Sequence, residues 1–213
     1  MKKNYYIAGM TLLVLSIIAA FMVPITQIIK YQDILNNGVA VKVRLNGFDP
    51  YDAFRGRFVA INLNFSSYKL PKPMTQDQFF PQDKHNNYRS KYPVNIILEK
   101  DKDGFASIKK MSFNLNETYD SNEIVMRGTQ SRWQVTYESK NNSYLSNGRM
   151  IAITPTTHIN RFYMNEFAAP RAEQLLRDNK VREKAYAIVK IKNKIPVIEN
   201  IYIDDKPISE FKK

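Results

Sequence analysis

The sequence predicts a mainly β protein of the β-rich α+β class, with an N-terminal transmembrane helix followed by a single extracytoplasmic domain. Two observations predict this. An uncharged apolar run spans residues 5–29. Beyond it, short segments alternate apolar with polar residues, the period of half-buried strands. The domain is expected to be an antiparallel β-sandwich or open barrel with one short helix. The predicted divisions are 1–30 for a cytoplasmic stub and the anchor, 31–38 for a stalk, and 39–213 for the β-rich domain.

The apolar run has the length of a membrane-spanning helix. At about 1.5 Å per residue, it crosses a hydrocarbon core of ~30 Å with room for tilt. Lys2 and Lys3 precede it, and the positive-inside rule then places the N-terminus in the cytoplasm. The alternative is a cleaved signal peptide, but the run is longer than a usual signal-peptide core, and Ile18 breaks the small-residue pattern before Ala20. We therefore expect an uncleaved single-pass anchor.

Basic residues outnumber acidic ones, at 32 Lys+Arg against 20 Asp+Glu, and the net charge is +12. They are spread over nearly every segment, without the basic stripe, aromatic RNA-binding motif or zinc-finger spacing of nucleic-acid-binding proteins. Diffuse positive charge on a tethered domain is favourable near anionic headgroups. The sequence thus favours a membrane-facing protein and predicts no nucleic-acid partner.

The chain has no cysteine and only 2 histidines, His85 and His158. Disulfides, thiolate metal sites and cysteine nucleophiles are therefore excluded, and so is a multi-histidine metal site. The 7 glycines form no phosphate-binding loop. We expect no metal and no cofactor.

The strands are expected at the alternating segments, and two of them, residues 39–46 and 59–65, flank a charged loop. Residues 66–90 contain Pro71, Pro73 and Pro81 among polar residues, which predicts an irregular excursion over the surface. Residues 101–104 read as a hairpin turn, in which Gly104 supplies a positive φ. Further strands are expected over residues 92–100, 105–113, 124–128, 133–138, 150–153, 185–191 and 197–203.

The short helix is expected after an extended stretch at residues 156–163. Asn165 can cap its N-terminus, and Pro170 fits its first turn. A narrow apolar stripe precedes Lys180 and consists of Ala172, Leu175 and Leu176.

The loop between the first two strands is the densest group of charges and turn formers. Asp49 and Asp52 could act as an acid–base pair or bind a cation. A structural interpretation is favoured, because Asp49 and Pro50 begin a β-turn. Arg55 can clamp one carboxylate, and Gly56 supplies the positive φ that re-enters the next strand. We assign no catalytic residue here.

Two other patterns resemble catalytic arrangements only weakly. Ser66 and Lys69 have a Ser-x-x-Lys spacing, but the serine of such enzymes opens a helix, whereas Ser66 follows an expected strand. A second polar cluster consists of His158, Arg161, Tyr163 and Glu166. Without a neighbouring nucleophile, its histidine is expected to be structural.

The motifs nevertheless resemble one family. Residues 49–56 match an Asp-Pro-x-Asp-x-x-Arg-Gly pattern, and Phe58 and Val59 begin the strand that follows it. Residues 160–166, with Arg161, Tyr163 and Glu166, and the terminal hairpin at 185–208 are also similar. On these residues the chain resembles the GDYXXLXY family of bacterial membrane-anchored proteins, over nearly its whole length.

The chain departs from the family pattern at several positions. Arg57 replaces the name-giving aspartate, Phe58 and Leu63 replace the motif tyrosines, and Asn165 replaces a proline before Glu166. The resemblance implies an anchor in the bacterial inner (cytoplasmic) membrane and a periplasmic domain. It also implies the company of a multi-pass membrane protein, and it supplies no reaction.

From these observations we expect a non-enzymatic, membrane-anchored envelope protein, a subunit or accessory of a membrane protein complex whose β-domain binds a protein partner. One alternative is a membrane-anchored envelope hydrolase of the signal-peptidase-like type. Another is a domain that contacts lipid or glycan through its basic surface and 13 tyrosines.

Overall fold

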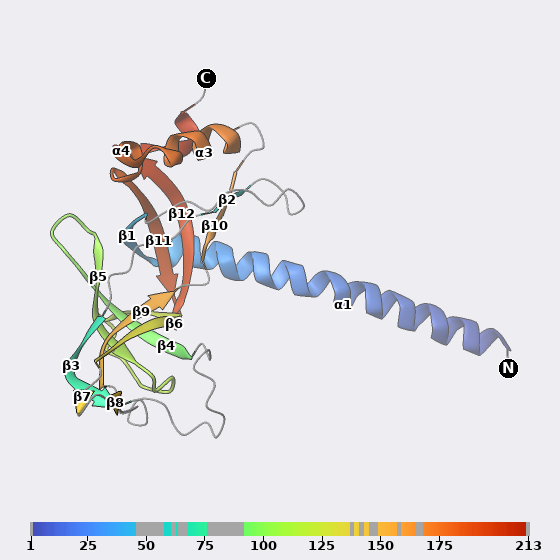
Figure 1. The fold of residues 1–213 in the computed structure, drawn as a ribbon. Helices are drawn as coiled ribbons and strands as arrows, with labels where there is room; N and C mark the ends of the chain where they lie inside the picture. The colour runs from blue at the N-terminus through green and yellow to red at the C-terminus, as the bar shows by residue number, and fades with distance from the viewer. Residues whose placement is uncertain are drawn as a thin grey trace. The chain divides into compact units, whose positions relative to one another are not determined.

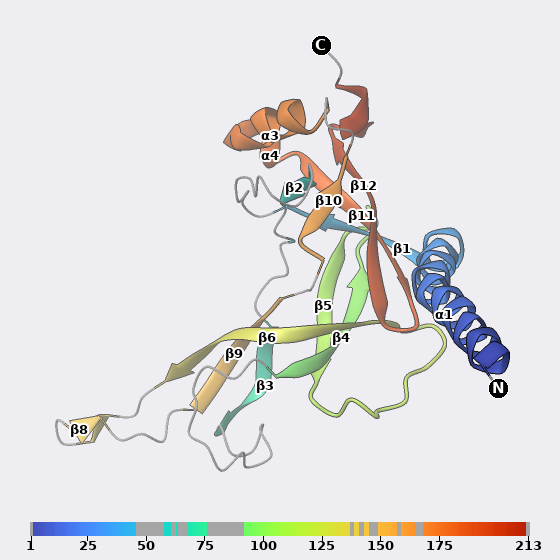
Figure 2. The same ribbon diagram turned by 90° about the vertical axis from the view of Figure 1, so that its right-hand side faces the viewer.

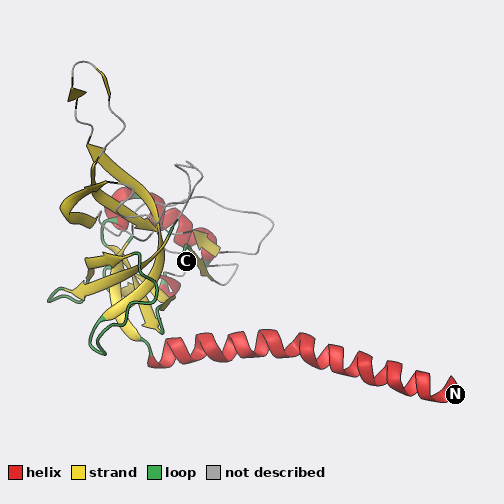
Figure 3. Ribbon diagram, turned by 90° about the horizontal axis from the view of Figure 1, so that it is seen from below, coloured by secondary structure: helices red, strands yellow, loops and turns green. Residues whose placement is uncertain are grey.

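A computed structural model describes residues 2–45, 58–60, 63, 68–75, 92–136, 139–140, 143–144, 149–156, 159–164 and 168–211. The chain divides into two compact units, Met1–Gly38 and Val39–Lys213. The first is one long helix, and the second consists mostly of strands with short helices (Figures 1 and 3).

The helix α1 (Lys2–Asn37) continues past the apolar run through the stretch expected to act as a stalk. Its section Gly9–Asn37 is 29 residues long and apolar enough to cross a membrane. At about 1.5 Å per residue it exceeds a ~30 Å hydrocarbon core. The helix ends at Gly38, whose N–H donates to the carbonyl of Ile34 at 2.8 Å. This helix is compatible with a membrane anchor.

The first sheet is antiparallel, with strand order β1-β11-β12-β13. It consists of β1 (Val39–Arg44), β11 (Ala185–Lys192), β12 (Ile195–Ile203) and β13 (Lys206–Pro207). Two tight turns join the last three strands, and both have left-handed backbone at consecutive non-glycine residues. The φ angles are 52° and 64° at Asn193 and Lys194, and 48° and 61° at Asp204 and Asp205. Positive φ at both central residues matches the twist of hairpin strands.

The second sheet has five strands in the order β3-β9-β6-β4-β5, all pairing antiparallel (Figure 2). Its strands are β3 (Tyr68–Thr75), β4 (Pro93–Lys100), β5 (Ala106–Ser112), β6 (Ile124–Thr136) and β9 (Arg149–Thr156). Two smaller pairs are β2 (Phe58–Ala60) with β10 (Arg161–Tyr163), and β7 (Ser139–Lys140) with β8 (Ser143–Tyr144).

One core lies where the two large sheets meet. Alternate side chains of β1, β11 and β12 contribute to it, and so do side chains of β4 and β6. Ala172 and Leu176 of α3 (Ala169–Arg177) complete it. The short helices α4 (Asn179–Arg182) and η1 (Ile208–Glu210) follow α3 and β13. Among the described strands neither sheet closes on itself, so the fold is a β-rich α+β arrangement of open sheets.

The strand predictions for 92–100, 105–113 and 150–153 are confirmed by β4, β5 and β9. The hairpin turn at 101–104 is also confirmed, and Gly104 has a φ of 83°. Residues 124–128 and 133–138, expected as two strands, belong largely to the single strand β6.

The predicted irregular excursion is wrong for residues 68–75, which form β3. Pro71 and Pro73 lack the N–H that a ladder needs, which is why they argued against a strand. β3 lies at the edge of its sheet, where proline is tolerated. Its pairing with β9 is irregular between Lys69 and Met74.

The helix prediction is partly right. Pro170 lies in the first turn of α3 as expected, but Ala168 occupies the N-cap position without a side-chain hydrogen bond. The expected cap, Asn165, is therefore wrong, because the helix begins later. The apolar stripe of Ala172, Leu175 and Leu176 lies within α3 as expected. The helix ends at Arg177, earlier than the expected end at Lys180, because Asp178 caps α4 by accepting from the Lys180 N–H at 2.9 Å.

Candidate binding surface

The two stretches that carry the family-like motifs meet in space. β2 and β10 pair antiparallel although about a hundred residues separate them, with Ala60 opposite Arg161 and Phe58 opposite Tyr163. Arg161 is exposed, and Tyr163 is 63% exposed. The structure thus brings together three of the predicted motif residues, Phe58, Arg161 and Tyr163.

The other six predicted motif residues lie outside the described part of the chain: Asp49, Pro50, Asp52, Arg55, Gly56 and Glu166. The turn expected to begin at Asp49 and Pro50 and to be held by Arg55 and Gly56 therefore stays a prediction. Ser66 and His158, around which a hydrolase would be built, lie outside it too. Lys69 is in β3 and exposed. Among the residues that the structure describes, no three potential His, Asp or Glu ligands gather as a metal site would require.

A different group of functional side chains lies on the outer face of the first sheet. β1 alternates, so that Val41 and Val43 enter the core while Lys42 and Arg44 face the other way. Cross-strand pairing places Arg44 opposite Tyr186 of β11 and Tyr186 opposite Tyr202 of β12. Phe105, from the turn between β4 and β5, contacts these side chains and completes the group. We call it the cation–aromatic surface; it consists of Lys42, Arg44, Phe105, Tyr186 and Tyr202.

The turn between β4 and β5 supplies Phe105. Asp101 shapes this turn, because its carboxylate accepts from the Asp103 N–H at 2.9 Å and from the Phe105 N–H at 2.8 Å. The carbonyl of Gly104 then accepts from the Lys42 N–H at 3.0 Å, and Lys42 and Phe105 form a parallel bridge. These backbone bonds fix the phenyl ring of Phe105 beside β1.

The rings and cations stack in a defined order. The Tyr186 and Tyr202 rings lie 5.4 Å apart at 9°, whereas Phe105 meets Tyr186 edge-on at 5.6 Å and 76°. The Arg44 guanidinium lies 4.4 Å from the Phe105 centroid. The Lys42 ammonium lies 5.1 Å from the Tyr186 centroid and 5.5 Å from that of Phe105. These distances are within the ~6 Å range of cation–π attraction.

Tyr186 is the centre of the surface. It is only 8% exposed, and its hydroxyl donates to the Asp205 carboxylate at 2.7 Å. Burial, and then this hydrogen bond, raise the pKa of Tyr186 to about 12. The left-handed turn thus makes two side-chain contacts: Asp205 accepts from the Tyr186 hydroxyl, and the Asp204 carboxylate pairs with the Lys184 ammonium at 3.1 Å.

Lys42 and Arg44 have no carboxylate partner within ion-pair distance among the described residues. Arg44 is exposed, and Lys42 is partly exposed. Arginine and tyrosine are enriched at the energetic centres of protein interfaces, and rings held in place lose little entropy on binding. Chemically, this arrangement can hold carboxylate groups against a preformed aromatic platform.

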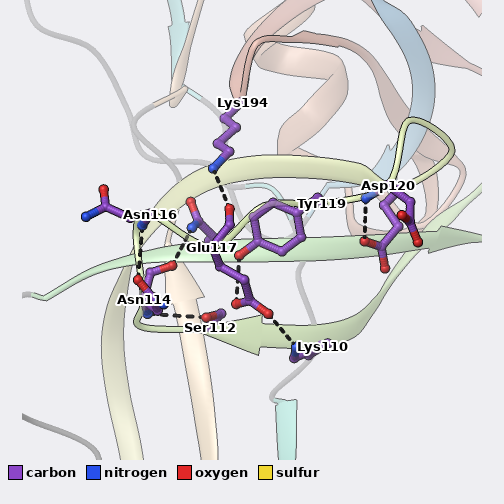
Figure 4. Close-up of polar contacts among 10 residues, drawn as sticks. Lys110, Ser112, Asn114, Asn116, Glu117, Tyr119, Asp120 and Lys194 are labelled. Atoms are coloured by element: carbon purple, nitrogen blue, oxygen red, sulfur yellow. Dashed lines mark hydrogen bonds and ion pairs between the residues drawn. The ribbon is translucent and has the colours of Figure 1, made fainter.

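A second polar cluster, the loop cluster, lies on the connection between β5 and β6 (Figure 4). The Glu117 carboxylate binds the Lys110 ammonium at 2.8 Å and accepts from the Tyr119 hydroxyl at 3.1 Å. The hydrogen bond from Lys110 lowers the pKa of Glu117 to about 2. Lys194 reaches across from the β11–β12 turn, 4.8 Å from the Tyr119 ring centroid and 3.5 Å from the Glu117 carbonyl. We define the loop cluster as Lys110, Glu117, Tyr119 and Lys194.

The loop cluster connects the two sheets. The Lys194 carbonyl accepts from the Arg127 N–H of β6 at 2.8 Å, and Met126 and Lys194 form a parallel bridge. Beneath the loop, buried Asn95 donates to the carbonyl of Asn114 at 3.0 Å. Within the loop cluster, Lys110 and Glu117 pair with each other and Lys194 bonds to a backbone carbonyl, which is the arrangement of a structural cluster.

Comparison with known families identifies the chain. A family model described as GDYXXLXY protein matches residues 20–194. The chain belongs to the GDYXXLXY family. The match in this GDYXXLXY protein covers α1 from residue 20 onward, the β2–β10 pair, the whole second sheet, and β1 and β11 of the first sheet. No curated protein and no solved structure matches it.

Sequence reasoning missed the cation–aromatic surface of this GDYXXLXY protein, although its signals were present. Lys42 and Arg44 already stood on the polar face of an expected strand. Tyr186 and Tyr202 stand at facing positions of the terminal hairpin. What the sequence could not supply was the pairing of β1 with β11, which brings Arg44 opposite Tyr186.

Proposed function

We propose that this GDYXXLXY protein is a non-enzymatic, membrane-anchored envelope protein whose β-domain binds a protein partner, as a subunit or accessory of a membrane protein complex. The anchor is α1, inserted in the cytoplasmic membrane of a bacterium. Lys2 and Lys3 hold the N-terminus in the cytoplasm by the positive-inside rule. The β-domain then lies on the periplasmic side.

The observation that carries the proposal is the cation–aromatic surface. Lys42 and Arg44 lie over aromatic rings without a carboxylate partner in the described part of the chain. A partner segment with Asp or Glu side chains would supply the missing charge. Contacts that combine a charge-assisted hydrogen bond with burial of a ring are the strong ones in interfaces.

The preferred partner is a multi-pass membrane protein, or another envelope protein, with an acidic segment outside the membrane. A shared membrane confines both proteins to one surface, so that the second contact forms at a high effective concentration. Side chains of α1 between residues 9 and 32 are exposed, which leaves the helix available for lateral packing in the bilayer.

The test uses the full-length, affinity-tagged protein extracted from native membranes in a mild nonionic detergent. Lys42→Glu/Arg44→Glu reverses the two cations and is expected to lower partner recovery at least tenfold. The control Lys72→Glu/Lys109→Glu makes the same change in net charge at two exposed lysines of β3 and β5, outside the surface and the turn that carries Phe105, and is expected to retain the partner.

A photoreactive residue at Asn200 locates the contact. Asn200 lies opposite Ile188 on β11, two residues from Tyr202 along β12 and therefore on the same face of the sheet. It should cross-link to the partner, whereas the same group at Lys109 should not. A chain that purifies alone in every mild detergent, or equal recovery with both double variants, would contradict the proposal.

A further inference from the structure

A pocket borders the turn at Asp204 and Asp205, the turn that also holds the Tyr186 hydroxyl. Its volume is about 300 Å³, at the lower end of the ~300–1,000 Å³ range of small-molecule sites. Its apolar lining comes from four different elements or their flanks and consists of Leu175, Val181, Ile203 and Phe211. Ile203 is buried, and the other three are partly buried, so the floor is set by the core.

Charged residues of one dominant sign surround this floor. Lys180, Lys184, Lys206 and Asp204 complete the lining. Asp204 forms an ion pair with Lys184, with the carboxylate and ammonium 3.1 Å apart. Lys180 and Lys206 have no ion-pair partner among the described residues. The rim therefore carries two uncompensated positive charges over an apolar floor.

The local backbone holds these groups in place. Asp178 caps α4 and so fixes the start of the turn that carries Lys180 and Val181. The left-handed residues Asp204 and Asp205 reverse the chain between Ile203 and Lys206. The pocket floor, Lys180 and Lys206 thus come from short segments whose backbone is held by a cap and a tight turn, which lowers the entropy cost of binding.

We propose that this pocket binds an aliphatic anion, a short hydrocarbon chain that ends in a carboxylate or phosphate group. The chain lies on the floor formed by Leu175, Val181, Ile203 and Phe211, where it is removed from water. The head group accepts hydrogen bonds from the Lys180 and Lys206 ammonium groups, which are charge-assisted. An aliphatic cation would be repelled by the rim, and an uncharged chain would leave both lysines unpaired.

The experiment uses the full-length protein in phosphatidylcholine nanodiscs and an octanoate analogue that carries a photoreactive diazirine. Irradiation is expected to label peptides containing Leu175, Val181 or Phe211. Excess octanoate or octyl phosphate should remove the label, and octylammonium and octanol should not. Whichever anion competes at lower concentration identifies the head group that the rim prefers.

Variants test the two halves of the site separately. Lys180→Glu/Lys206→Glu is expected to reduce labelling at least tenfold, whereas Lys72→Glu/Lys109→Glu, with the same charge change at exposed residues of β3 and β5, should label normally. Phe211→Ala removes part of the floor and should weaken octanoate and octyl phosphate together. Circular dichroism melting of each variant confirms that the fold is intact.

Equal labelling of the rim variant and its control would overturn the proposal, as would equal competition by octylammonium. Protection of the pocket only by a copurifying polypeptide would assign it to a protein and would also overturn it. Failure here leaves the cation–aromatic surface untouched, because neither double variant alters Lys42 or Arg44.

Discussion

The cation–aromatic surface and the loop cluster use the same kinds of side chain in opposite ways. In the loop cluster, Lys110 has the Glu117 carboxylate at 2.8 Å, and Lys194 lies over Tyr119 and near a carbonyl. On the cation–aromatic surface, Lys42 and Arg44 lie over rings with no carboxylate partner in the described residues. The first arrangement connects two parts of the fold. The second leaves two positive charges without a carboxylate in the described part of the chain, which is the basis of the proposed partner contact.

Rings are held in different ways in the two regions. Tyr186 is buried, and its hydroxyl donates to the Asp205 carboxylate in the β12–β13 turn. Tyr119 belongs to the longer β5–β6 connection, where its hydroxyl bonds to Glu117 and its ring faces Lys194. The tyrosine at the centre of the cation–aromatic surface is therefore the more deeply buried of the two. Stability should therefore respond more to changes at Tyr186 than to changes at Glu117.

Tyr186→Ala should have the largest effect. Removing a buried ring in contact with Phe105 and Tyr202 should cost about 3 kcal/mol of unfolding free energy, as for other buried aromatic residues. Tyr186→Phe keeps the ring and loses only the hydrogen bond to Asp205, for about 1 kcal/mol. Denaturant unfolding of the full-length protein in detergent, followed by Trp133 fluorescence, measures both. Equal losses would show that the ring packing contributes little.

High pH should act on the same residue with a smaller effect. The pKa of Tyr186 is about 12 when folded and near 10 when unfolded, so the folded state holds the proton more tightly. The stabilisation is complete below pH ~10 and is lost as the pH rises through 12, by at most about 2 kcal/mol. Ultraviolet titration at the tyrosinate band follows the group.

Tyr186→Phe is the control for that titration and should remove the late-titrating phenol. Asp205→Asn should bring the pKa of Tyr186 closer to 10, because it removes the neighbouring negative charge. An unchanged titration in Asp205→Asn would mean that burial alone sets the pKa.

Acid should weaken the loop cluster, with the smallest effect. The pKa of Glu117 is lowered from 4.5 to about 2 by its hydrogen bond with Lys110, so its contribution is present above pH ~4.5 and is lost as the pH falls through 2. Since both side chains contact solvent, water and salt screen the ion pair and its contribution should be small. Between pH 2 and 6, the melting temperature of Glu117→Gln should change less with pH than that of the unchanged protein.

Glu183→Gln provides the reference for that measurement, because Glu183 is exposed and its carboxylate forms no ion pair among the described residues. Its melting curve should keep the acid dependence of the unchanged protein. If both variants lose the dependence equally, the acid response does not come from Glu117.

Local patterns in the sequence were sufficient for much of the fold. The alternation of Val41 and Val43 with Lys42 and Arg44 identified β1 and its polar face, and residues 101–104 identified a turn. Both depend on neighbours within one segment. β3 was missed because Pro71 and Pro73 argue against a strand unless it lies at an edge, and edge position depends on the rest of the sheet.

The candidate site was less accessible to sequence reasoning, because it is built from distant segments. Phe105 contacts Arg44 through the β4–β5 turn, and Tyr186 lies more than a hundred residues further along. Sequence patterns drew the search for a site to Asp49 and Asp52, which stand close together in the sequence. The residues of the cation–aromatic surface are instead far apart in the sequence, and only the register of β1, β11 and β12 brings them together.

The pairing of β1 with β11 has a consequence for biosynthesis. β1 follows α1 directly, yet its only ladder partner among the described strands is made after residue 184. At ~5–20 residues per second, the intervening residues take on the order of ten seconds to synthesise. Throughout that interval, Val41 and Val43 lack the strand that covers them. Under the proposed topology the nascent chain is an exposed edge held at the membrane, so a chaperone on the periplasmic side should bind it first. Stop codons before β11 should then yield chains that are degraded.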